Sequence, residues 1–594
     1  MVKRIKVTQK KPVSWLAPKG LVQTAIKAMQ AALFGAYADR RETIAALSPR
    51  ETDSDTKPIS YANERELWFD YIADTGDGWD ATYAIACLVG EDTLDVAGAD
   101  RRLKRGAFTI LGGDEVYPTA TREDYQERLI DPFWCAHATD DEPPKVYALP
   151  GNHDWYDGLT SFMRLFLQLD RKIGPWQAHQ RRTYFAIELP HNWWIWGVDV
   201  QLESDIDAPQ VEYFKHYADK LTRSDRVILC TPEPSWVEGA DDKYRKLKNI
   251  KIKTHENLVF LEDLIHKAGA KIPLRIAGDL HHYARYEGRD RKDQLITCGG
   301  GGAFLHSTHP LPDSVNLIST FGQWFDKKVV SPSAAWCKQQ RKKVFLRIWD
   351  NRGFALAVAA IYAFYAWVLE AASEGLVDYP APHLSLFDYF AQKSDCPIVP
   401  WSRVTSHSLF ALLLTLAIVI GPAVYGIKMK RFATSSTWPV IGGLLHGAAH
   451  LFTAIYLMWL FSSWGSYHFL FGLVPIFFLG LFFGTFYMAL YLYLANLLYD
   501  GHDEEVFSCQ AITDYKCFAR FHLTRKGLTL YPIGLATVPK AWRPAEVALG
   551  LPPQKIRGEL TYDLSAPDNL KRIFEPDPPG ALQPRLIEPP IKIG

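Results

Sequence analysis

The chain has 594 residues, too many for one hydrophobic core, and at about 150 residues per domain this length predicts three or four units. Hydrophobic residues make up 48% of the chain, which excludes wholesale disorder. The 66 basic residues balance 66 acidic ones, so no overall charge favours nucleic acid, and we predict no nucleic-acid partner. The sequence leaves the oligomeric state open.

The sequence pattern predicts a helical extension over residues 1–60. An amphipathic helix is expected around residues 21–47, followed by a polar stretch that contains Pro58. The first fifteen residues are basic, but no apolar run follows them, so we expect no secretory signal peptide.

Residues 61–335 predict a soluble head in which strands and helices alternate. The run YAIACLV at 83–89 fits either a strand or a helix, whereas buried strands are expected at 108–111, 146–149, 193–200, 226–230 and 274–277. Four apolar runs lead into polar clusters, which read DTGDG at 74–78, GGD at 112–114, GNHD at 151–154 and GDLHH at 278–282. Strands that end in acids, amides and histidines are typical of a layered α/β enzyme with its site at the carboxyl edge.

The eight cysteines include no CxxC pair. Neither a disulfide framework nor a structural zinc site is indicated, and reduced thiols in a cytosolic compartment fit this pattern.

Residues 336–499 predict a transmembrane domain, because only ten charged residues lie between Gly353 and Tyr499. Each charge at a bilayer centre costs at least about 2.5–3.5 kcal/mol, so their scarcity is informative. Four spans are expected at about 353–370, 404–427, 438–461 and 468–498, with a polar and aromatic break at 462–467.

Basic residues cluster before the first span and after the second, while the loop between those spans carries four acids and two bases. The positive-inside bias therefore predicts a multi-pass protein whose head and C-terminus face the cytoplasm. His446 and His450 lie four residues apart in the third span and share a helical face. They fit either a metal or proton-relay site, or two neutral histidines bonded to neighbouring helices.

The remaining chain predicts a small cytosolic β unit at 500–545 and a Pro-rich tail at 546–594. Two strands are expected at 518–523 and 528–533 around the turn TRKG. The tail composition is typical of extended or disordered chain.

The four polar clusters resemble the motifs of the calcineurin-like metallophosphoesterases, which run D-x-H, G-D-x-x-D, G-N-H-D/E, a lone His and G-H-x-H. The resemblance covers roughly residues 65–310, and the flanking GNHDWYDGL and TCGGGGAFLH are similar to a membrane-anchored branch. The resemblance implies a layered α/β fold, a β-sandwich flanked by helices.

The resemblance also implies a site for two divalent metal ions. Asp114 would bridge both ions, Asp74 and His281 would bind the first, and Asn152 and Asp279 the second. Two cations about 3.5–4 Å apart activate a water and stabilise both the attacking and the leaving oxygen of a phosphoryl group.

His153 and Asp154 are the catalytic candidates that the resemblance implies. His153 would lie beside the scissile phosphate, oriented by Asp154, and would stabilise the phosphoryl oxygens or protonate the leaving group.

The sequence departs from the family pattern at four positions. Gly76 stands where the first motif has His, with Asp77 next to it as the candidate replacement metal ligand, and Tyr117 ends the second motif. The lone His is absent from 230–233, where Glu233 is the one good ligand, and Asp279 replaces a His in the last motif. Carboxylates near these gaps favour harder ions, so we expect Mn or Mg rather than Zn or Fe.

The sequence thus predicts a membrane-bound phosphoesterase that hydrolyses a phosphomonoester or phosphodiester with a metal-activated hydroxide. A lipid-like substrate near the bilayer is expected, since four spans otherwise have no evident use. The alternative is a non-catalytic membrane sensor or transporter whose degenerate head binds a phosphorylated ligand.

Overall fold

The computed structural model describes most of the chain, in thirteen stretches: residues 3–34, 59–137, 143–168, 171–200, 206–238, 253–317, 323–373, 386–393, 397–428, 437–545, 548–556, 559–566 and 572–594. The chain divides into two compact units. The first comprises Met1–Val13, Gln23–Ala335 and Ala511–Gly594, and the second comprises Ser14–Val22 and Trp336–Gln510.

The first unit is built on two nine-stranded sheets of mixed α/β topology. One sheet has the order β16 (Ser314–Leu317), β17 (Gln323–Ser331), β14 (Tyr283–Gly288), β15 (Gln294–Cys298), β13 (Lys271–Ala277), β12 (Arg226–Thr231), β11 (Trp193–Gly197), β10 (Phe185–Leu189) and β2 (Ile59–Ser60). Strands β11, β12, β13 and β15 run parallel to one another. The strands predicted at 193–200, 226–230 and 274–277 are confirmed here.

The other sheet has the order β24 (Arg585–Leu586), β19 (Gly527–Leu535), β18 (Lys516–Thr524), β3 (Leu67–Ile72), β6 (Phe108–Leu111), β7 (Lys145–Ala148), β9 (Trp176–Ala178) and β8 (Lys172–Ile173), and β25 (Ile591–Ile593) pairs with β19. Strands β3, β6 and β7 are parallel, so their carboxyl ends lie at one edge. Every residue of β3 is buried, as expected for a central strand with apolar side chains on both faces.

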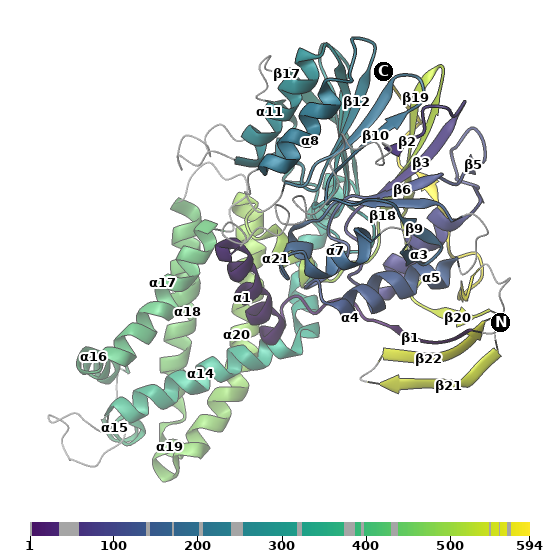
Figure 1. Ribbon diagram of the computed structural model, residues 1–594. Helices are drawn as coiled ribbons and strands as arrows, with labels where there is room; N and C mark the ends of the chain where they lie inside the picture. Colours follow the sequence, from purple (N-terminus) through teal and green to yellow (C-terminus); the bar gives the residue numbers. More distant parts are fainter. Residues whose placement is uncertain are drawn as a thin grey trace. The chain divides into compact units, whose positions relative to one another are not determined.

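One buried cluster draws side chains from both sheets, among them Phe69 and Ile110 from one and Ile228 and Leu274 from the other. The outer face of each sheet packs against helices in a cluster of its own. The helices α8 (Ala208–Ala218) and α11 (Lys253–Lys267) cover one sheet, while α3 (Trp79–Gly90), α5 (Asp131–Ala136) and α7 (Thr160–Phe166) cover the other (Figure 1). The ambiguous run at 83–89 is therefore helical.

The C-terminal segment does not form a small β unit of its own, as the sequence predicted for 500–545. Both predicted strands exist, but β18 pairs with β3 in the middle of the head's sheet. Arg520 of β18 forms a fully buried ion pair with Asp70 of β3, with Nε 2.7 Å from Oδ1. Pairing between strands so distant in sequence leaves no local signal.

The Pro-rich segment also differs from the prediction, because its described residues form strands rather than a disordered tail. Strand β22 (Glu559–Ala566) lies between β21 (Ala548–Ile556) and the N-terminal β1 (Lys3–Gln9), with Val7 opposite Tyr562. Ile593 of β25 belongs to the core shared by the sheets. At the N-terminus, α1 (Pro18–Phe34) begins before the helix predicted at 21–47, and residues 35–47 lie outside the described part.

In the second unit, four helices are long and apolar enough to cross a membrane. They are α14 (Arg352–Ser373), α17 (Leu409–Lys428), α18 (Thr437–Leu460) and α20 (Phe469–Tyr499), close to the predicted spans, although the second begins five residues later than expected. The shorter α15 (Leu386–Lys393), α16 (Ile398–His407), α19 (Ser462–Tyr467) and α21 (Asp503–Ser508) accompany them.

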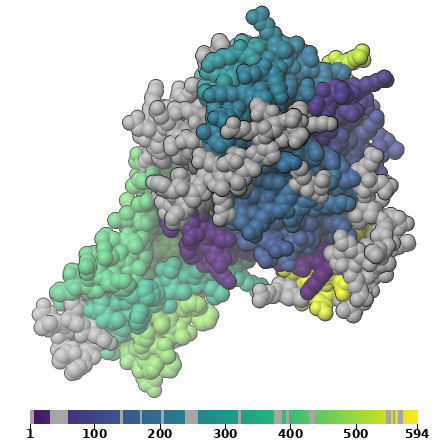
Figure 2. Space-filling view, in the orientation of Figure 1, coloured from purple at the N-terminus to yellow at the C-terminus, as the bar shows by residue number. Residues whose placement is uncertain are grey.

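Small residues bring these helices close together, as in membrane bundles generally. A Cβ on Gly443 of α18 would lie 2.4 Å from Cα of Ala423 in α17. Large apolar side chains such as Leu413, Leu445 and Phe478 instead face outward and are more than half exposed. The helices present a continuous outer surface in the space-filling view, drawn in green (Figure 2).

The two histidines of α18 contact aromatic side chains of neighbouring helices. The Tyr362 hydroxyl lies 3.0 Å from Nδ1 of His450, and the His446 ring stacks on Tyr491 at 4.5 Å between centroids. Among the described residues, no group of three or more His, Cys, Asp and Glu is placed to hold a metal ion. These contacts fit the predicted alternative of histidines bonded to neighbouring helices.

Candidate active site

Three aspartates follow the carboxyl ends of strands from both sheets. Asp74 follows β3, Asp114 follows β6 and Asp279 follows β13, and their φ angles are 60°, 53° and 65°. The left-handed region costs a residue other than glycine of order 1–3 kcal/mol and is retained where surrounding contacts impose it, often at functional sites. Such contacts exist here, because the Asp74 amide donates to Gly113 O at 3.0 Å and the Asp279 amide donates to Asp74 Oδ1 at 3.1 Å.

The Tyr117 hydroxyl lies where two of these aspartates meet His281. Its oxygen is 3.0 Å from Asp74 Oδ1, 3.1 Å from Asp114 Oδ2 and 2.9 Å from His281 Nε2. All four side chains are buried. The sequence treated Tyr117 only as a departure from a motif, whereas the structure places its oxygen at the middle of the predicted ligands.

His281 is oriented so that Nε2 faces this cluster without a proton. Its Nδ1 lies 2.8 Å from the carbonyl oxygen of Phe304, an acceptor, so Nδ1 carries the proton and donates it. The imidazole ring stacks on His306 at 3.8 Å between centroids. Burial, assisted by the nearby Lys516 ammonium, holds the pKa of His281 well below its ordinary value, so the ring is neutral.

The Tyr117 hydroxyl therefore faces more acceptor atoms than it has protons to donate. Asp74 Oδ1, Asp114 Oδ2 and His281 Nε2 surround a hydroxyl that has one proton to donate. The second carboxylate oxygen of Asp74 is buried and has no hydrogen-bond partner among the described residues. Burial and the neighbouring carboxylates of Asp114 and Asp279 raise the pKa of Asp74 well above its ordinary value.

These four donors are chemically suited to a divalent cation. Carboxylate and phenol oxygens with one imidazole nitrogen suit Mn, Mg or another ion that accepts oxygen ligands. Counting only His, Cys, Asp and Glu, no group of three in the described chain is placed to hold a metal. The Tyr117 oxygen lies near 3 Å from each of the other three atoms.

The loop that carries GNHD folds against Asp114. Helix α6 (Asn152–Trp155) begins there, and the His153 amide donates to Asp114 Oδ1 at 2.9 Å. A Cβ on Gly151 would lie 2.1 Å from the same oxygen, so only glycine permits this approach. Asn152 Nδ2 donates to the Tyr156 hydroxyl at 3.3 Å.

The imidazole of His153 is held by a backbone carbonyl. Its Nδ1 lies 2.9 Å from Pro118 O, and burial lowers its pKa to about 4. Asp154 instead accepts hydrogen bonds from the Gly151 amide at 2.9 Å, the Glu115 amide at 3.3 Å and the Tyr125 hydroxyl. Through these hydrogen bonds, Asp154 holds the GNHD loop in place.

The two remaining predicted metal ligands are Asp77 and Glu233. Asp77 accepts the Val13 amide at 2.7 Å on one carboxylate oxygen and the Phe304 amide at 3.0 Å on the other. Glu233 is half-buried in a loop whose preceding carbonyl, Pro232 O, accepts the Gly278 amide at 3.1 Å. The described contacts place neither carboxylate against the Tyr117 cluster.

The gap in the first motif has a steric cause. Gly76 has a φ of +50°, and a Cβ there would lie 2.2 Å from Glu115 O. No imidazole fits at this position.

Lys516 is a site residue that the sequence did not indicate. It opens β18, is buried, and donates from its ammonium to Ala303 O, next to the Phe304 carbonyl that holds His281. Burial lowers its pKa to about 8, against the opposing effect of Cys517 and Asp77. Its place in the site depends on a strand pairing that no local pattern reveals.

Comparison with known proteins places the chain close to none of them. No protein-family model matches the chain, and no curated protein matches it. It is similar to the solved structure described as "GAP50 the anchor in the inner membrane complex of Plasmodium", at 12% identity over 44% of this chain and 84% of that one, with a TM-score of 0.29. It is also similar to PhoD, at 11% identity over 42% of this chain and 60% of that one, with a TM-score of 0.28. The case for a function therefore rests on the site.

Proposed function

We propose that this chain is a membrane-bound, metal-dependent phosphoesterase that hydrolyses a phosphomonoester or a phosphodiester. The observation that supports it most is the buried cluster of Asp74, Asp114, His281 and Tyr117, which has three acceptors for one proton. The two sheets with a shared core and outer helices agree with the layered sandwich that the motif resemblance implies.

In this proposal Asp74, Asp114, Tyr117 and His281 hold one divalent cation, and Asn152 and Asp279 serve a second. Two such ions offset the charge on a phosphoryl group and supply an activated water at neutral pH. The oxygen-rich donor set favours Mn or Mg over Zn or Fe.

The chain's own residues complete the proposed chemistry. Nδ1 of His153 donates a hydrogen bond to Pro118 O, so Nε2 of the neutral ring carries no proton. Donating a proton to a leaving group therefore requires the imidazolium form. Asp154 fixes the turn that positions His153, and the Lys516 ammonium adds positive charge behind His281. Positioning and positive charge are the two main contributions to phosphoryl transfer.

The metal-dependent activity is testable on the purified full-length protein in detergent. We expect bound divalent metal and turnover of p-nitrophenyl phosphate or bis-p-nitrophenyl phosphate with added Mn. Asp114→Asn should lower the rate by about 10²–10³-fold. The matched control is Asp131→Asn, another buried aspartate, which contacts Gln126 outside the cluster and should retain the rate.

The alternative is a head that binds a phosphorylated ligand without turnover. Protein that carries no metal and hydrolyses neither ester, with or without added Mn, would favour it. An Asp114→Asn variant as active as the Asp131→Asn control would also contradict the catalytic proposal.

A substrate at or near the bilayer, with the head on the cytoplasmic side, is part of the proposal. Its support is the four apolar helices. The test compares phospholipid in vesicles with soluble bis-p-nitrophenyl phosphate on the same reconstituted protein. A preference for the vesicle substrate is expected, and a rate on the soluble ester alone would contradict it.

A further inference from the structure

A large cavity lies at the end of the sheets opposite to the candidate active site. Its volume is about 1800 Å³. Glu66 and Lys271, which line it, lie at the start of β3 and β13, whereas Asp74 and Asp279 follow the ends of the same strands. The six residues of β3 span roughly 20 Å, so the cavity is separate from the Tyr117 cluster.

The lining of this cavity is strongly basic, although the chain as a whole is neutral. Ten lysine and arginine side chains line it against four acids. Among the ten are Arg226, Lys271, Lys292, Lys526 and Lys592. Like charges gathered around one hollow raise its potential and attract anions from solution.

Four acidic or basic side chains of the lining have ion-pair partners. Arg275 Nε lies 2.6 Å from Glu262, Arg101 lies 3.4 Å from Asp100, and Glu66 lies 2.9 Å from Lys104. By contrast, the structure shows no ion pair between Lys292, Lys526 or Lys592 and any described residue. These lysines are exposed, so their ammonium groups are available to a ligand.

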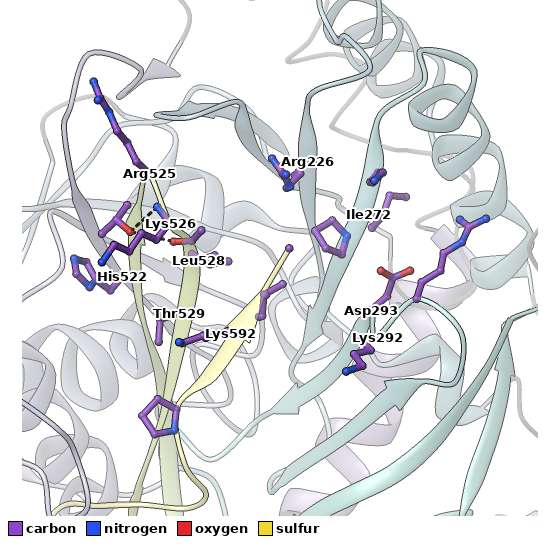
Figure 3. A pocket seen from close by; sticks show the side chains of 18 of the residues that line it. Arg226, Ile272, Lys292, Asp293, His522, Arg525, Lys526, Leu528, Thr529 and Lys592 are labelled. Carbon is purple, nitrogen blue, oxygen red and sulfur yellow. Dashed lines mark hydrogen bonds between the residues drawn. The ribbon is translucent and has the colours of Figure 1, made fainter.

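The unpaired charges lie on two walls that face each other. Lys526, in the turn between β18 and β19, and Lys592, in β25, come from one sheet, while Arg226 and Lys292 come from the other (Figure 3). The Arg226 guanidinium lies over the Trp193 ring, 5.6 Å from its centroid, which restricts its movement. Basic side chains thus lie on both sides of the cavity.

We propose that this cavity binds a small soluble anion that carries several phosphate groups. Lysine and arginine on both walls can each donate charge-assisted hydrogen bonds to separate phosphates. The lining contains one aromatic ring besides its two histidines, that of Tyr531, so it offers little surface on which successive nucleic-acid bases could stack. The ligand class is therefore a compact polyphosphate rather than single-stranded nucleic acid, and this inference does not depend on the catalytic one.

The test is calorimetric titration of the full-length protein in detergent with inositol hexakisphosphate as the probe. We expect saturable binding that weakens at least tenfold between about 50 and 300 mM salt, because exposed charges are screened. The double substitution Lys526→Glu and Lys592→Glu should weaken binding by at least tenfold. The matched control, Lys172→Glu with Arg181→Glu, changes the charge equally at exposed positions outside the cavity and should bind as the parent does.

Two further measurements distinguish binding in this cavity from binding elsewhere on the protein. Asp114→Asn should leave the affinity for inositol hexakisphosphate unchanged, since that residue belongs to the distant cluster. Orthophosphate should bind far more weakly than the probe. Equal loss in the control double variant, loss in Asp114→Asn, absence of binding at low salt, or tighter binding of a short single-stranded DNA would each overturn the proposal.

Discussion

Tyr117 is the residue whose contacts most change the interpretation of the site. Its hydroxyl links Asp74, Asp114 and His281, which the sequence proposed as ligands without any reason to include a tyrosine. The family motif has an aspartate at this position, so comparison with the motif alone treats the tyrosine as a missing carboxylate. In the folded chain the phenol oxygen is another hard donor.

We expect Tyr117→Phe to lower bound metal and phosphoesterase activity by about 10–100-fold, the usual cost of removing a supporting contact at a metal site. The measurements are metal content of the purified protein and the rate with added Mn. Tyr61→Phe is the matched control, since that hydroxyl bonds only the Tyr147 hydroxyl, at 3.1 Å, within the described contacts. Unchanged metal content in Tyr117→Phe would contradict the assignment.

Gly76 allows a second prediction at this scale. Gly76→Ala should destabilise the protein by ~1–3 kcal/mol more than Gly158→Ala, because only at Gly76 does a Cβ collide with backbone. Both glycines have positive φ, at +50° and +66°, so backbone strain is matched between them. Denaturant unfolding of the two variants measures the difference, and equal stabilities would contradict the steric argument.

Several candidate residues were found from sequence because they follow apolar strands within a few residues. The Tyr117 hydroxyl contacts Asp74, Asp114 and His281, and the GNHD loop contacts Asp114 through the His153 amide. Two partners of Asp77 and Asp154 were not predictable, since they are backbone amides of distant segments, those of Val13 and Glu115. Residue type alone does not distinguish a ligand from an acceptor of backbone hydrogen bonds.

Among the secondary-structure elements, β18 joins parts of the chain that are distant in sequence. Its ion pair with β3 joins residues 450 positions apart, and Arg520 also donates to Val89 O at 3.2 Å. The turn residues predicted that this strand belongs to a hairpin, but they did not predict its pairing with β3. Strand existence is a local property, but pairing depends on the whole fold.

Arg520→Met should destabilise the head by about 3–5 kcal/mol, because it leaves Asp70 buried without its countercharge. Thermal or denaturant unfolding of the full-length protein measures this. Arg289→Met, which breaks an exposed pair with Asp326, is the control and should cause a much smaller change. Replacing Asp70 by Leu in the Arg520→Met background should recover much of the loss.

At the scale of the whole molecule, the head is discontinuous in sequence, since the second unit is inserted between its strands. A chain that ends at Ala335 lacks β18 and β19, so β3 would have an unpaired edge and an uncovered core. We expect this truncated chain to aggregate or to be digested rapidly by protease. A chain in which a long flexible linker replaces Trp336–Gln510 should resist the protease, and equal resistance of both chains would contradict this.

The same pairing limits how the four apolar helices can cross a membrane. Because β3 and β18 are neighbours in one sheet, the segments before α14 and after α20 must lie on the same side, which requires an even number of crossings. Cysteines introduced at the exposed Lys172 and Lys526 should therefore react together, or not at all, with a membrane-impermeant maleimide in sealed vesicles. Reaction at only one of them would contradict this arrangement.

The late position of β18 also sets an order of events during synthesis. The ribosome translates all four apolar helices before Lys516, so the head cannot complete its sheet until those helices have been synthesised. A nascent chain in this interval exposes the edge of β3 and needs a chaperone's protection. Products of premature termination lack Lys516, whose ammonium lies behind His281, so their candidate site is incomplete.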